Sequence, residues 1–318
     1  MILAKTPLRI SFVGGGSDHL ISENSFGSVI SIGINKFIYL SIIKRDENTS
    51  KISYSKKETF TNINHINHPL FREVLKHFKI YDKGIEITST ADIQGKGSGL
   101  GSSGSFTVCL INLILEFKKI KMNKEKIAEL AWIIENEKCR KHCGKQDQYQ
   151  AAYGGLNQIN FLESGAVKVN KINIDNFRLN KFKDNLILFD TGIRRNSVNI
   201  LSRMKGKLID FSKMYDLLKD FKYELLKGDI DNCGRILAES WQIKKKFTYN
   251  ISNSLIEKSY DIAIKNGAIG GKLLGAGSGG FLLFYCPKIY QARLIKKLNY
   301  LTNLDFNFFT DSTSVKKI

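Results

Sequence analysis

The sequence predicts an α+β protein with two domains. Strand-like runs follow one another through the N-terminal part of the chain, whereas residues 198–246 are largely helical in pattern. These runs do not repeat as βα units, which argues against a doubly wound parallel sheet. A chain of 318 residues is also long enough for two cores of ordinary domain size. We therefore expect domains at 1–180 and 181–318, divided near the polar stretch Asn170–Asp184.

The N-terminal half is expected to begin with strands. Residues 8–13 alternate, with Leu8, Ile10 and Phe12 on one face, as a half-buried strand requires. A helix-like stretch is expected at His68–Phe78, and the further strand-like runs are Gly27–Ile34, Phe37–Lys44, Ile52–Tyr54 and Gly84–Ile93.

Two helices should follow the last of these strands. The first covers about 105–117 and comes directly after a dense glycine–serine segment, Gly95–Gly104. The second is expected to begin at the N-cap Asn123 and to end near Cys143. Its buried stripe has i, i+3, i+4 and i+7 spacing and consists of Ile127, Leu130, Ala131 and Ile134.

The C-terminal half contains a second glycine cluster. A core strand is expected at Asn185–Asp190 and a helix at 253–266. The glycine cluster Gly270–Gly280 then leads at once into a strand over Phe281–Cys286.

The charge balance is strongly basic. The chain has 49 Lys and Arg against 30 Asp and Glu, a formal charge of +19. A positive surface attracts nucleic acid and anionic lipid. The lysines are scattered along the chain, however, and a mildly positive field also suits an enzyme whose substrates carry phosphate. We expect small phosphorylated substrates and neither nucleic acid nor membrane, and we keep a basic nucleic-acid-binding protein as the alternative from another class.

Cysteine usage and hydropathy indicate the compartment. The five cysteines show no disulfide-framework spacing, which is typical of a reducing environment. The N-terminal residues do not resemble a signal peptide, and no apolar run reaches the length of a membrane span. We expect a cytoplasmic protein.

The segment Gly95–Gly104 is expected to bind phosphate. The order strand, glycine-rich loop, helix brings backbone N–H groups and the positive end of the helix dipole to an anion. The Walker A pattern does not occur, nor do the H-R-D and D-F-G segments of protein kinases. Gly99, Gly101 and Gly104 satisfy the dinucleotide string G-x-G-x-x-G, but Lys124-Glu125 opens another helix where that fold requires a second strand.

Three segments of the chain together resemble the GHMP kinase family. The central segment Gly99-Leu100-Gly101-Ser102-Ser103-Gly104 matches the family's phosphate loop, although the usual preceding proline is missing. The N-terminal motif matches residues 7–18 (PLRISFVGGGSD), and the C-terminal motif matches residues 272–281 (KLLGAGSGGF). The resemblance implies a two-domain GHMP kinase fold, with a ribosomal S5 domain 2-like N-terminal domain, a ferredoxin-like C-terminal domain and the active site in the cleft between them.

The resemblance also implies roles for individual residues, with ATP and Mg²⁺ as cofactors. Asp147 matches the family's catalytic base or orienting carboxylate, and Arg9 its basic residue near the transferring phosphoryl group. Ser103 is expected on the metal together with a glutamate. Periodicity leaves Glu135 and Glu137 equivalent, and the register of the family segment ending in G-K-Q-D favours Glu135. The expected ATP-binding residues are Gly95, Gly97, Ser98, Gly99, Leu100, Gly101, Ser102 and Ser103, and the expected substrate-binding residues are Gly15, Gly16, Ser17, Asp18, Lys145, Gln146, Asp147, Arg195, Gly275 and Gly277.

The substrate expectation rests on the same resemblance. Within the family, the three segments are most similar to members that phosphorylate the anomeric hydroxyl of D-glycero-D-manno-heptose 7-phosphate, toward GDP-heptose for surface polysaccharide. Galactokinase-type sequences have Glu-His where this chain has Gly15-Gly16, which should leave room for a longer sugar. Arg195 falls where related sequences have an arginine and is expected to bind the 7-phosphate. A fucose-like or galactose-like acceptor remains the alternative, and the protein is expected to be a monomer or homodimer.

Overall fold

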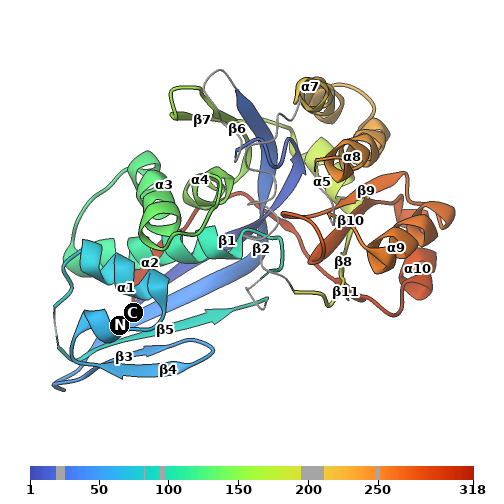
Figure 1. Ribbon diagram of the computed structural model, residues 1–318. Helices are drawn as coiled ribbons and strands as arrows, with labels where there is room; N and C mark the ends of the chain where they lie inside the picture. The colour runs from blue at the N-terminus through green and yellow to red at the C-terminus, as the bar shows by residue number, and fades with distance from the viewer. Residues whose placement is uncertain (19–25, 82, 94–96, 195–210, 248–250) are drawn as a thin grey trace.

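The structure is a computed structural model of the chain. It describes residues 1–318 except 19–25, 82, 94–96, 195–210 and 248–250 (Figure 1). The predicted site residues Gly95 and Arg195 lie outside the described residues.

The larger sheet is centred on the long strand β2 (Gly27–Lys44), which spans both strand-like runs expected there. Neighbouring strands are antiparallel, except that β3 and β5 are parallel. β12 and β6 also pair with β2, and β7 pairs with β6. Within the described residues this sheet has nine strands, and its main path runs β13 (Ser314–Lys317), β1 (Ile2–Val13), β2, β5 (Ile85–Ala91), β3 (Ser50–Ser53), β4 (Lys57–Phe60), with β6 (Leu156–Phe161), β7 (Val167–Lys171) and β12 (Phe308–Phe309) beside it.

Helices α1 to α4 lie over one face of this sheet (Figure 1). α2 and α4 pack directly on β1 and β2, while α1 and α3 pack on α2. Their bounds are α1 (Pro69–His77), α2 (Ser102–Lys118), α3 (Lys124–Ile133) and α4 (Gln146–Tyr153), and a 3₁₀ turn, η1 (Ile63–His65), precedes α1. This arrangement places the first turns of α2 and α4 beside β1.

The helix after Asn123 is shorter than predicted. Asn123 caps α3 as expected, because its side chain accepts the N–H of Lys126 at 2.8 Å. The helix continues as one π-helical turn, η2 (Ile134–Lys138), and then ends. Arg140 adopts a left-handed conformation (φ 51°), which no helix accommodates. The expected continuation to Cys143 is therefore wrong, and residues 139–145 form a loop that leads into α4.

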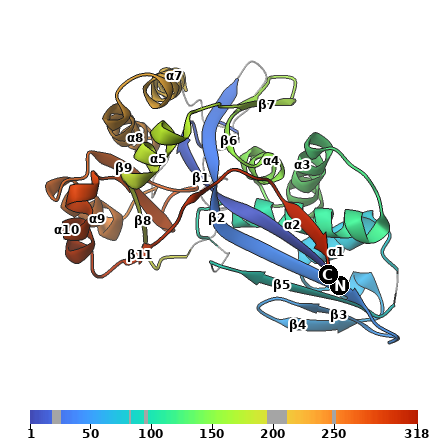
Figure 2. The same ribbon diagram turned by 180° about the vertical axis from the view of Figure 1, so that it is seen from behind.

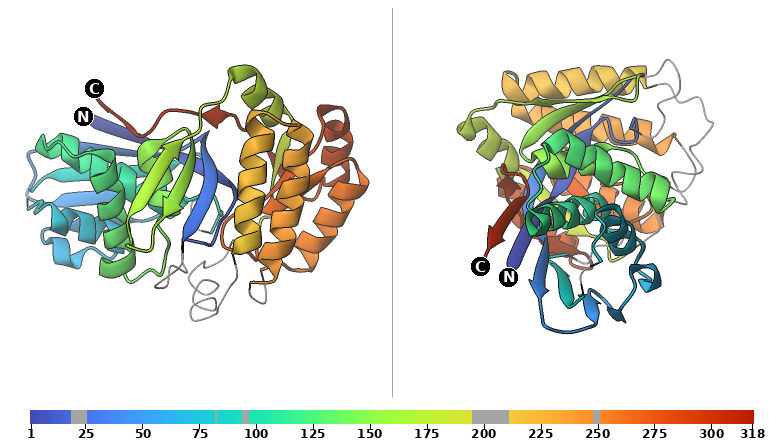
Figure 3. Two further views of the ribbon diagram at one scale, coloured as in Figure 1. Left: turned by 90° about the horizontal axis from the view of Figure 1, so that it is seen from above. Right: turned by 90° about the vertical axis from the view of Figure 1, so that its left-hand side faces the viewer.

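The second sheet is formed by four described strands, all antiparallel to their neighbours. Helix α8 packs across β9 and β10, and α7 lies against α8 (Figure 3). The elements of this half are α5 (Asn176–Asp184), β8 (Leu186–Asp190), α7 (Ser212–Leu226), α8 (Ile230–Lys245), α9 (Ser254–Lys265), β9 (Gly270–Leu273), β10 (Phe281–Tyr285), α10 (Lys288–Lys297) and β11 (Thr302–Leu304). The α+β prediction is confirmed.

An aromatic cluster joins the two halves. Phe12 of β1 lies 5.2 Å from Phe182 of α5 and 5.4 Å from Phe221 of α7, measured between ring centroids. All three rings are fully buried. Such aromatic contacts contribute stability beyond their buried area, so the halves are held together through β1.

The C-terminal strands return to the first sheet. β13 runs antiparallel to β1, so that both chain ends lie together (Figure 2). The backbone N–H of Ile318 donates to the carbonyl of Met1 at 2.9 Å. The predicted boundary near residue 180 stays a prediction. Strands β12 and β13 come after this boundary in the chain but pair with strands of the first sheet, so the residues after 180 do not all lie in the second half.

Helix length and hydropathy bear on the membrane expectation. Within the described part of the chain, none of the helices combines the length and the apolar character that crossing a membrane requires.

Candidate active site

The two predicted glycine clusters meet where the halves of the molecule join. A Cβ on Gly99 would lie 2.6 Å from the carbonyl oxygen of Leu274, and a Cβ on Gly275 would lie 2.5 Å from the Cα of Gly99. Both glycines have positive φ, 81° and 74°. Contact this close is possible only without side chains. The loops bound one cleft of about 1110 Å³, lined from both halves.

The glycine–serine loop leads into helix α2 as predicted. Gly97, Gly99 and Gly101 all have positive φ, and Gly101 is the N-cap of α2 without any side-chain cap. The first N–H groups of the helix therefore keep their capacity to bind an anion. Strand β1 fixes the loop in place, since the backbone N–H of Arg9 donates to the carbonyl of Leu100 at 3.0 Å. The hydroxyls of Ser98 and Ser102 lie 2.9 Å apart inside the loop.

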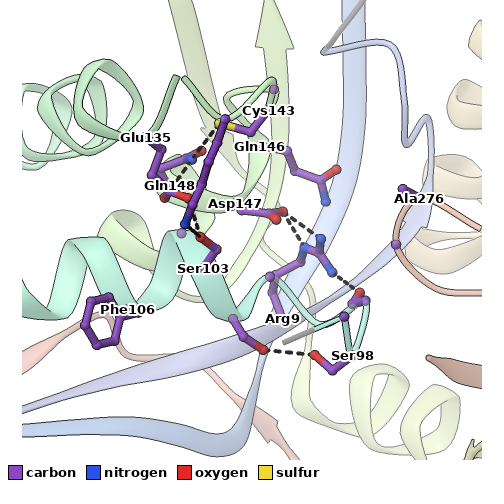
Figure 4. Close-up of a pocket in the computed structure, with 18 of the residues that line it drawn as sticks. Arg9, Ser98, Ser103, Phe106, Glu135, Cys143, Gln146, Asp147, Gln148 and Ala276 are labelled. Atoms are coloured by element: carbon purple, nitrogen blue, oxygen red, sulfur yellow. Dashed lines mark hydrogen bonds and ion pairs between the residues drawn. The ribbon is translucent and has the colours of Figure 1, made fainter. Parts of the chain in front are cut away.

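Arg9 and Asp147 form an ion pair across the floor of the cleft (Figure 4). Nε and one terminal nitrogen of Arg9 donate to Oδ1 of Asp147 at 2.9 and 2.6 Å. The other terminal nitrogen donates to the carbonyl of Gly99 at 2.7 Å. Asp147 lies in the first turn of α4, and its side chain is 33% exposed against 7% for Arg9. The arginine thus holds the carboxylate at the surface of the cleft beside the glycine loop.

Glycines in α2 and its N-cap make room for this pair. A Cβ on Gly104 would lie 2.7 Å from the Cβ of Asp147. A Cβ on Gly101 would lie 3.1 Å from Cγ of Arg9. The backbone of the loop can approach the ion pair this closely only because both positions lack side chains.

A second polar pair joins α2 to the π-helical turn after α3. The Ser103 hydroxyl donates to Oε2 of Glu135, and Nε2 of Gln148 donates to Oε1 at 3.1 Å (Figure 4). The ammonium of Lys141 lies 3.3 Å from the Ser103 hydroxyl. Glu135 is buried, whereas Glu137 is exposed, so the structure separates two glutamates that periodicity left equivalent.

The donors at this pair fit a magnesium ion. Mg²⁺ prefers oxygen ligands and is usually held by one or two carboxylates together with substrate phosphates and water. The Ser103 hydroxyl in the first turn of α2 and the Glu135 carboxylate beside it match that preference. Among the described residues there is no cluster of three or more acidic, histidine or cysteine ligands, as a dedicated protein cage would need.

Burial raises the pKa of the Glu135 carboxyl above its ordinary value, although Lys141, Ser103 and Gln148 partly offset the shift. A raised pKa means that, between the two pKa values, the folded protein keeps the Glu135 carboxyl protonated while the unfolded chain has lost this proton. The free energy of unfolding therefore falls as pH rises through the ordinary pKa toward the folded-state pKa. The resulting destabilisation is complete at pH values above both pKa values.

Replacing Glu135 by glutamine should therefore stabilise the protein at neutral pH in the absence of metal and nucleotide. The amide keeps hydrogen-bonding capacity but removes the buried charge, and we expect a gain of about 0.5–2 kcal/mol. Urea denaturation at pH 5 and pH 8 measures it, with a larger gain at pH 8. Glu137→Gln is the matched control and should change little, because Glu137 is exposed. Equal effects of the two substitutions on the free energy of unfolding would contradict the conclusion that Glu135 carries the buried charge.

The remaining predicted substrate residues divide into two groups. Gly15, Gly16, Asp18, Gln146 and Gly275 line the cleft. Asp18 accepts the backbone N–H of Gln146 at 3.1 Å.

Three others face elsewhere. The Ser17 hydroxyl donates to the carbonyl of Gly14 at 2.8 Å and is buried in the turn. The Lys145 ammonium is held by Glu129 at 2.8 Å and lies 4.3 Å from the ring centroid of Trp132. Gly277 packs on Ile251. These side chains and this glycine support the walls of the cleft without lining it.

One end of the cleft is aromatic and was not predicted. His68 lies 4.7 Å from Tyr54 and 5.4 Å from Phe106 between ring centroids. Burial, with a contribution from Lys141, lowers the pKa of His68 to about 4, so its ring is neutral at pH 7. Each residue comes from a different segment, and only their apolar character was visible in the sequence. An uncharged aromatic wall of this kind suits a purine ring.

Other cleft residues were missed as well. Lys272 and Ser11 stand inside the recognised motifs, so their position was a signal that went unused. Lys244 of α8 carries no motif and was hidden in a lysine-rich helix. Gln148 follows Asp147 closely and reaches Glu135.

Known families match the chain in both halves. The family described as GHMP kinases N terminal domain matches residues 66–155, and GHMP kinases C terminal matches residues 221–301. The first includes the glycine loop and Asp147, and the second includes Lys244 and the C-terminal glycine cluster.

Individual relatives span nearly the whole chain. A Campylobacter jejuni protein named D-glycero-alpha-D-manno-heptose 7-phosphate kinase is 31% identical over 315 residues, covering 93% of each chain. A solved structure described as a D-glycero-D-manno-heptose 1-phosphate kinase from Bacteroides thetaiotaomicron superposes with a TM-score of 0.82 at 25% identity, covering 100% of this chain and 99% of its own. Mevalonate kinase from Methanococcus jannaschii has a TM-score of 0.75 at 19% identity over 98% of each chain, which shows the fold alone. With both family domains in order and a relative of this identity along its length, the chain belongs to the GHMP kinase family.

Proposed function

We propose that this protein is an ATP-dependent sugar kinase that phosphorylates the anomeric hydroxyl of D-glycero-D-manno-heptose 7-phosphate. The product would be the 1,7-bisphosphate, on the way to GDP-heptose for surface polysaccharide. The observation that carries the proposal is the ion pair of Arg9 and Asp147, which lies beside the glycine loop in the cleft that Gly15, Gly16 and Asp18 also line. The 31% identity to a heptose 7-phosphate kinase supports the substrate.

The glycine loop would bind the nucleotide phosphates. Its backbone approaches without Cβ atoms, and the uncapped N–H groups at the start of α2 would donate to phosphate oxygens. The aromatic end with Tyr54, His68 and Phe106 would receive the base. The cleft is large enough in volume for a nucleotide and a sugar phosphate together.

Ser103 and Glu135 would hold the magnesium ion. When bound, the ion neutralises charge on the phosphates during transfer. Gln148 orients the Glu135 carboxylate through its hydrogen bond to Oε1, and Ser103 sits in the first turn of α2 next to the phosphate loop.

Asp147 would orient the acceptor hydroxyl and take its proton. Arg9 engages only Oδ1, and among the described residues Oδ2 has no hydrogen-bond partner in the protein. Oδ2 is therefore available to a substrate hydroxyl. The guanidinium also contacts the loop at Gly99, where it would stabilise charge on the transferring phosphoryl group.

The sugar would lie against Gly15 and Gly16. These positions carry no side chains, so a seven-carbon sugar has room beside Asp18, whose carboxylate suits a vicinal diol. Arg195 remains our candidate for the 7-phosphate on sequence grounds. We further propose that the protein acts in the cytoplasm as a monomer or homodimer, and all five of its cysteines are free.

A panel of acceptors tests the proposal. ADP release would be measured with heptose 7-phosphate, heptose 1-phosphate, mannose 6-phosphate, fucose and galactose. We expect the highest kcat/KM with heptose 7-phosphate. The new phosphate should sit on C1, shown by phosphorus coupling to the anomeric proton in NMR. Faster turnover of fucose or galactose would contradict the heptose assignment and identify that sugar as the substrate. Transfer to heptose 1-phosphate would show that the reacting hydroxyl is at the far end of the heptose from C1.

A further inference from the structure

Two buried lysines of the second half reach into the same cleft. Lys244, near the end of α8, is 7% exposed, and Lys272, in β9, is 3% exposed. The Lys272 ammonium donates to the carbonyl of Phe12 in β1, and the Lys244 ammonium donates to the carbonyl of Gly275. Both side chains line the cleft together with Arg9.

Three basic groups, Arg9, Lys244 and Lys272, meet at this part of the cleft. Burial lowers the pKa of the Lys272 amine well below its ordinary value, and Lys244 and Arg9 add to the shift. Within the described residues, no carboxylate lies at ion-pair distance from Lys272. Of the cleft's carboxylates on this side, Asp147 is engaged by Arg9 and Asp18 accepts the N–H of Gln146. Burying a cation without counter-charge is costly, so the position of Lys272 is not explained by stability.

Two further donors at the cleft lack protein partners. The hydroxyl of Ser11 and Nε2 of Gln146 are buried and make no hydrogen bond within the described part of the chain. Both residues line the cleft. Unsatisfied buried polar groups are rare in folded proteins and call for a ligand or water. Ammonium, hydroxyl and amide groups can all donate to an anion, and none of them adds negative charge.

We propose that Lys244, Lys272, Ser11 and Gln146 form an anion subsite that binds phosphoryl oxygens of the reactants where the two halves meet. The inference rests on the proposed function, because phosphate could arrive there from the end of the nucleotide or from the sugar phosphate. An anion would supply the counter-charge that Lys272 lacks and the acceptors that Ser11 and Gln146 lack. Such preorganised donors bind developing charge strongly in a buried site.

The test compares Lys272→Met and Lys244→Met with Lys245→Met, which removes a lysine one residue further along α8. Lys245 pairs with Glu257 at 3.0 Å and does not line the cleft. Binding of ATP, ADP, heptose 7-phosphate and unphosphorylated heptose would be measured by calorimetry. Loss of about tenfold or more in affinity for ATP but not ADP supports the subsite and assigns it to the transferred phosphoryl group. A similar loss for heptose 7-phosphate but not heptose supports it and assigns it to the sugar phosphate.

Unchanged binding of all four ligands by folded Lys272→Met and Lys244→Met would overturn the proposal. The ATP and ADP measurements do not depend on which sugar is the substrate. A wrong heptose assignment can therefore be distinguished from the absence of an anion subsite. A second measurement needs no variant. Because the pKa of Lys272 is depressed in the free protein, anion binding should raise this pKa and be accompanied by proton uptake at pH values between the free and the bound pKa. Calorimetry in two buffers of different ionisation enthalpy detects the uptake, and its absence would also count against the subsite.

Discussion

Replacing Asp147 by asparagine should lower kcat by about 10²–10⁴-fold, the usual contribution of a positioned general base. Asparagine has nearly the same shape and can still accept hydrogen bonds from Arg9 through its carbonyl oxygen. It cannot take a proton from the acceptor. The fold and nucleotide binding should therefore persist while turnover is lost.

Steady-state ADP release with saturating ATP and sugar phosphate measures the effect, and calorimetry measures the retained affinity for ATP. Asp175→Asn is a matched control, since Asp175 caps α5 through its side chain and asparagine caps equally well. Near-full turnover of the Asp147 variant would leave only an orienting role for this carboxylate, or none.

Replacing Gly275 by alanine should both destabilise the protein and weaken ATP binding. The left-handed conformation alone costs a non-glycine residue about 1–2 kcal/mol. Here the new Cβ would also lie 2.5 Å from the Cα of Gly99, so the C-terminal glycine cluster and the phosphate loop must separate. We expect a loss in the free energy of unfolding larger than the conformational cost, and an increase of about tenfold or more in the KM for ATP.

Gly165→Ala isolates the conformational cost. Gly165 has φ 80°, against 74° for Gly275, and no atom lies within 4 Å of its ideal Cβ. Urea denaturation of both variants gives the difference that belongs to the contact between loops. If the two variants lose equal stability and both bind ATP normally, the close approach of Gly99 and Gly275 has no functional consequence.

The local elements of the site are predictable from the chain itself. A dense run of glycines and a helix that begins directly after it can be read from the residue order, so the sequence suffices to place Gly97, Gly99 and Gly101 in the loop that leads into α2. The cap at Asn123 is predictable for the same reason, because a side chain that binds its own helix needs no distant partner.

Elements that bury few apolar side chains were not predicted from the sequence. Helix α5 lies inside the polar stretch expected to separate the halves, and it buries a single phenylalanine, Phe182. Periodicity cannot detect a helix with one buried side chain, although Phe182 contacts the rings of Phe12, Phe221, Tyr285 and Phe308 in the folded protein. The π-helical turn at Ile134–Lys138 was equally invisible, since nothing in its composition distinguishes it from an α-helix.

The sequence alone determined the α+β class, the glycine–serine loop before α2 and, through three ordered motifs, the family of this protein. Only the tertiary structure decided which polar side chains meet. Arg9 reaches Asp147 across 138 positions of the chain, and Lys272 reaches the Phe12 carbonyl across 260. It also pairs Ser103 with Glu135, the glutamate that the register of the family segment favoured and that periodicity could not separate from Glu137. The physical reason is that backbone conformation follows from neighbours in the chain, whereas contact between distant side chains depends on how the helices and the two sheets pack around β1.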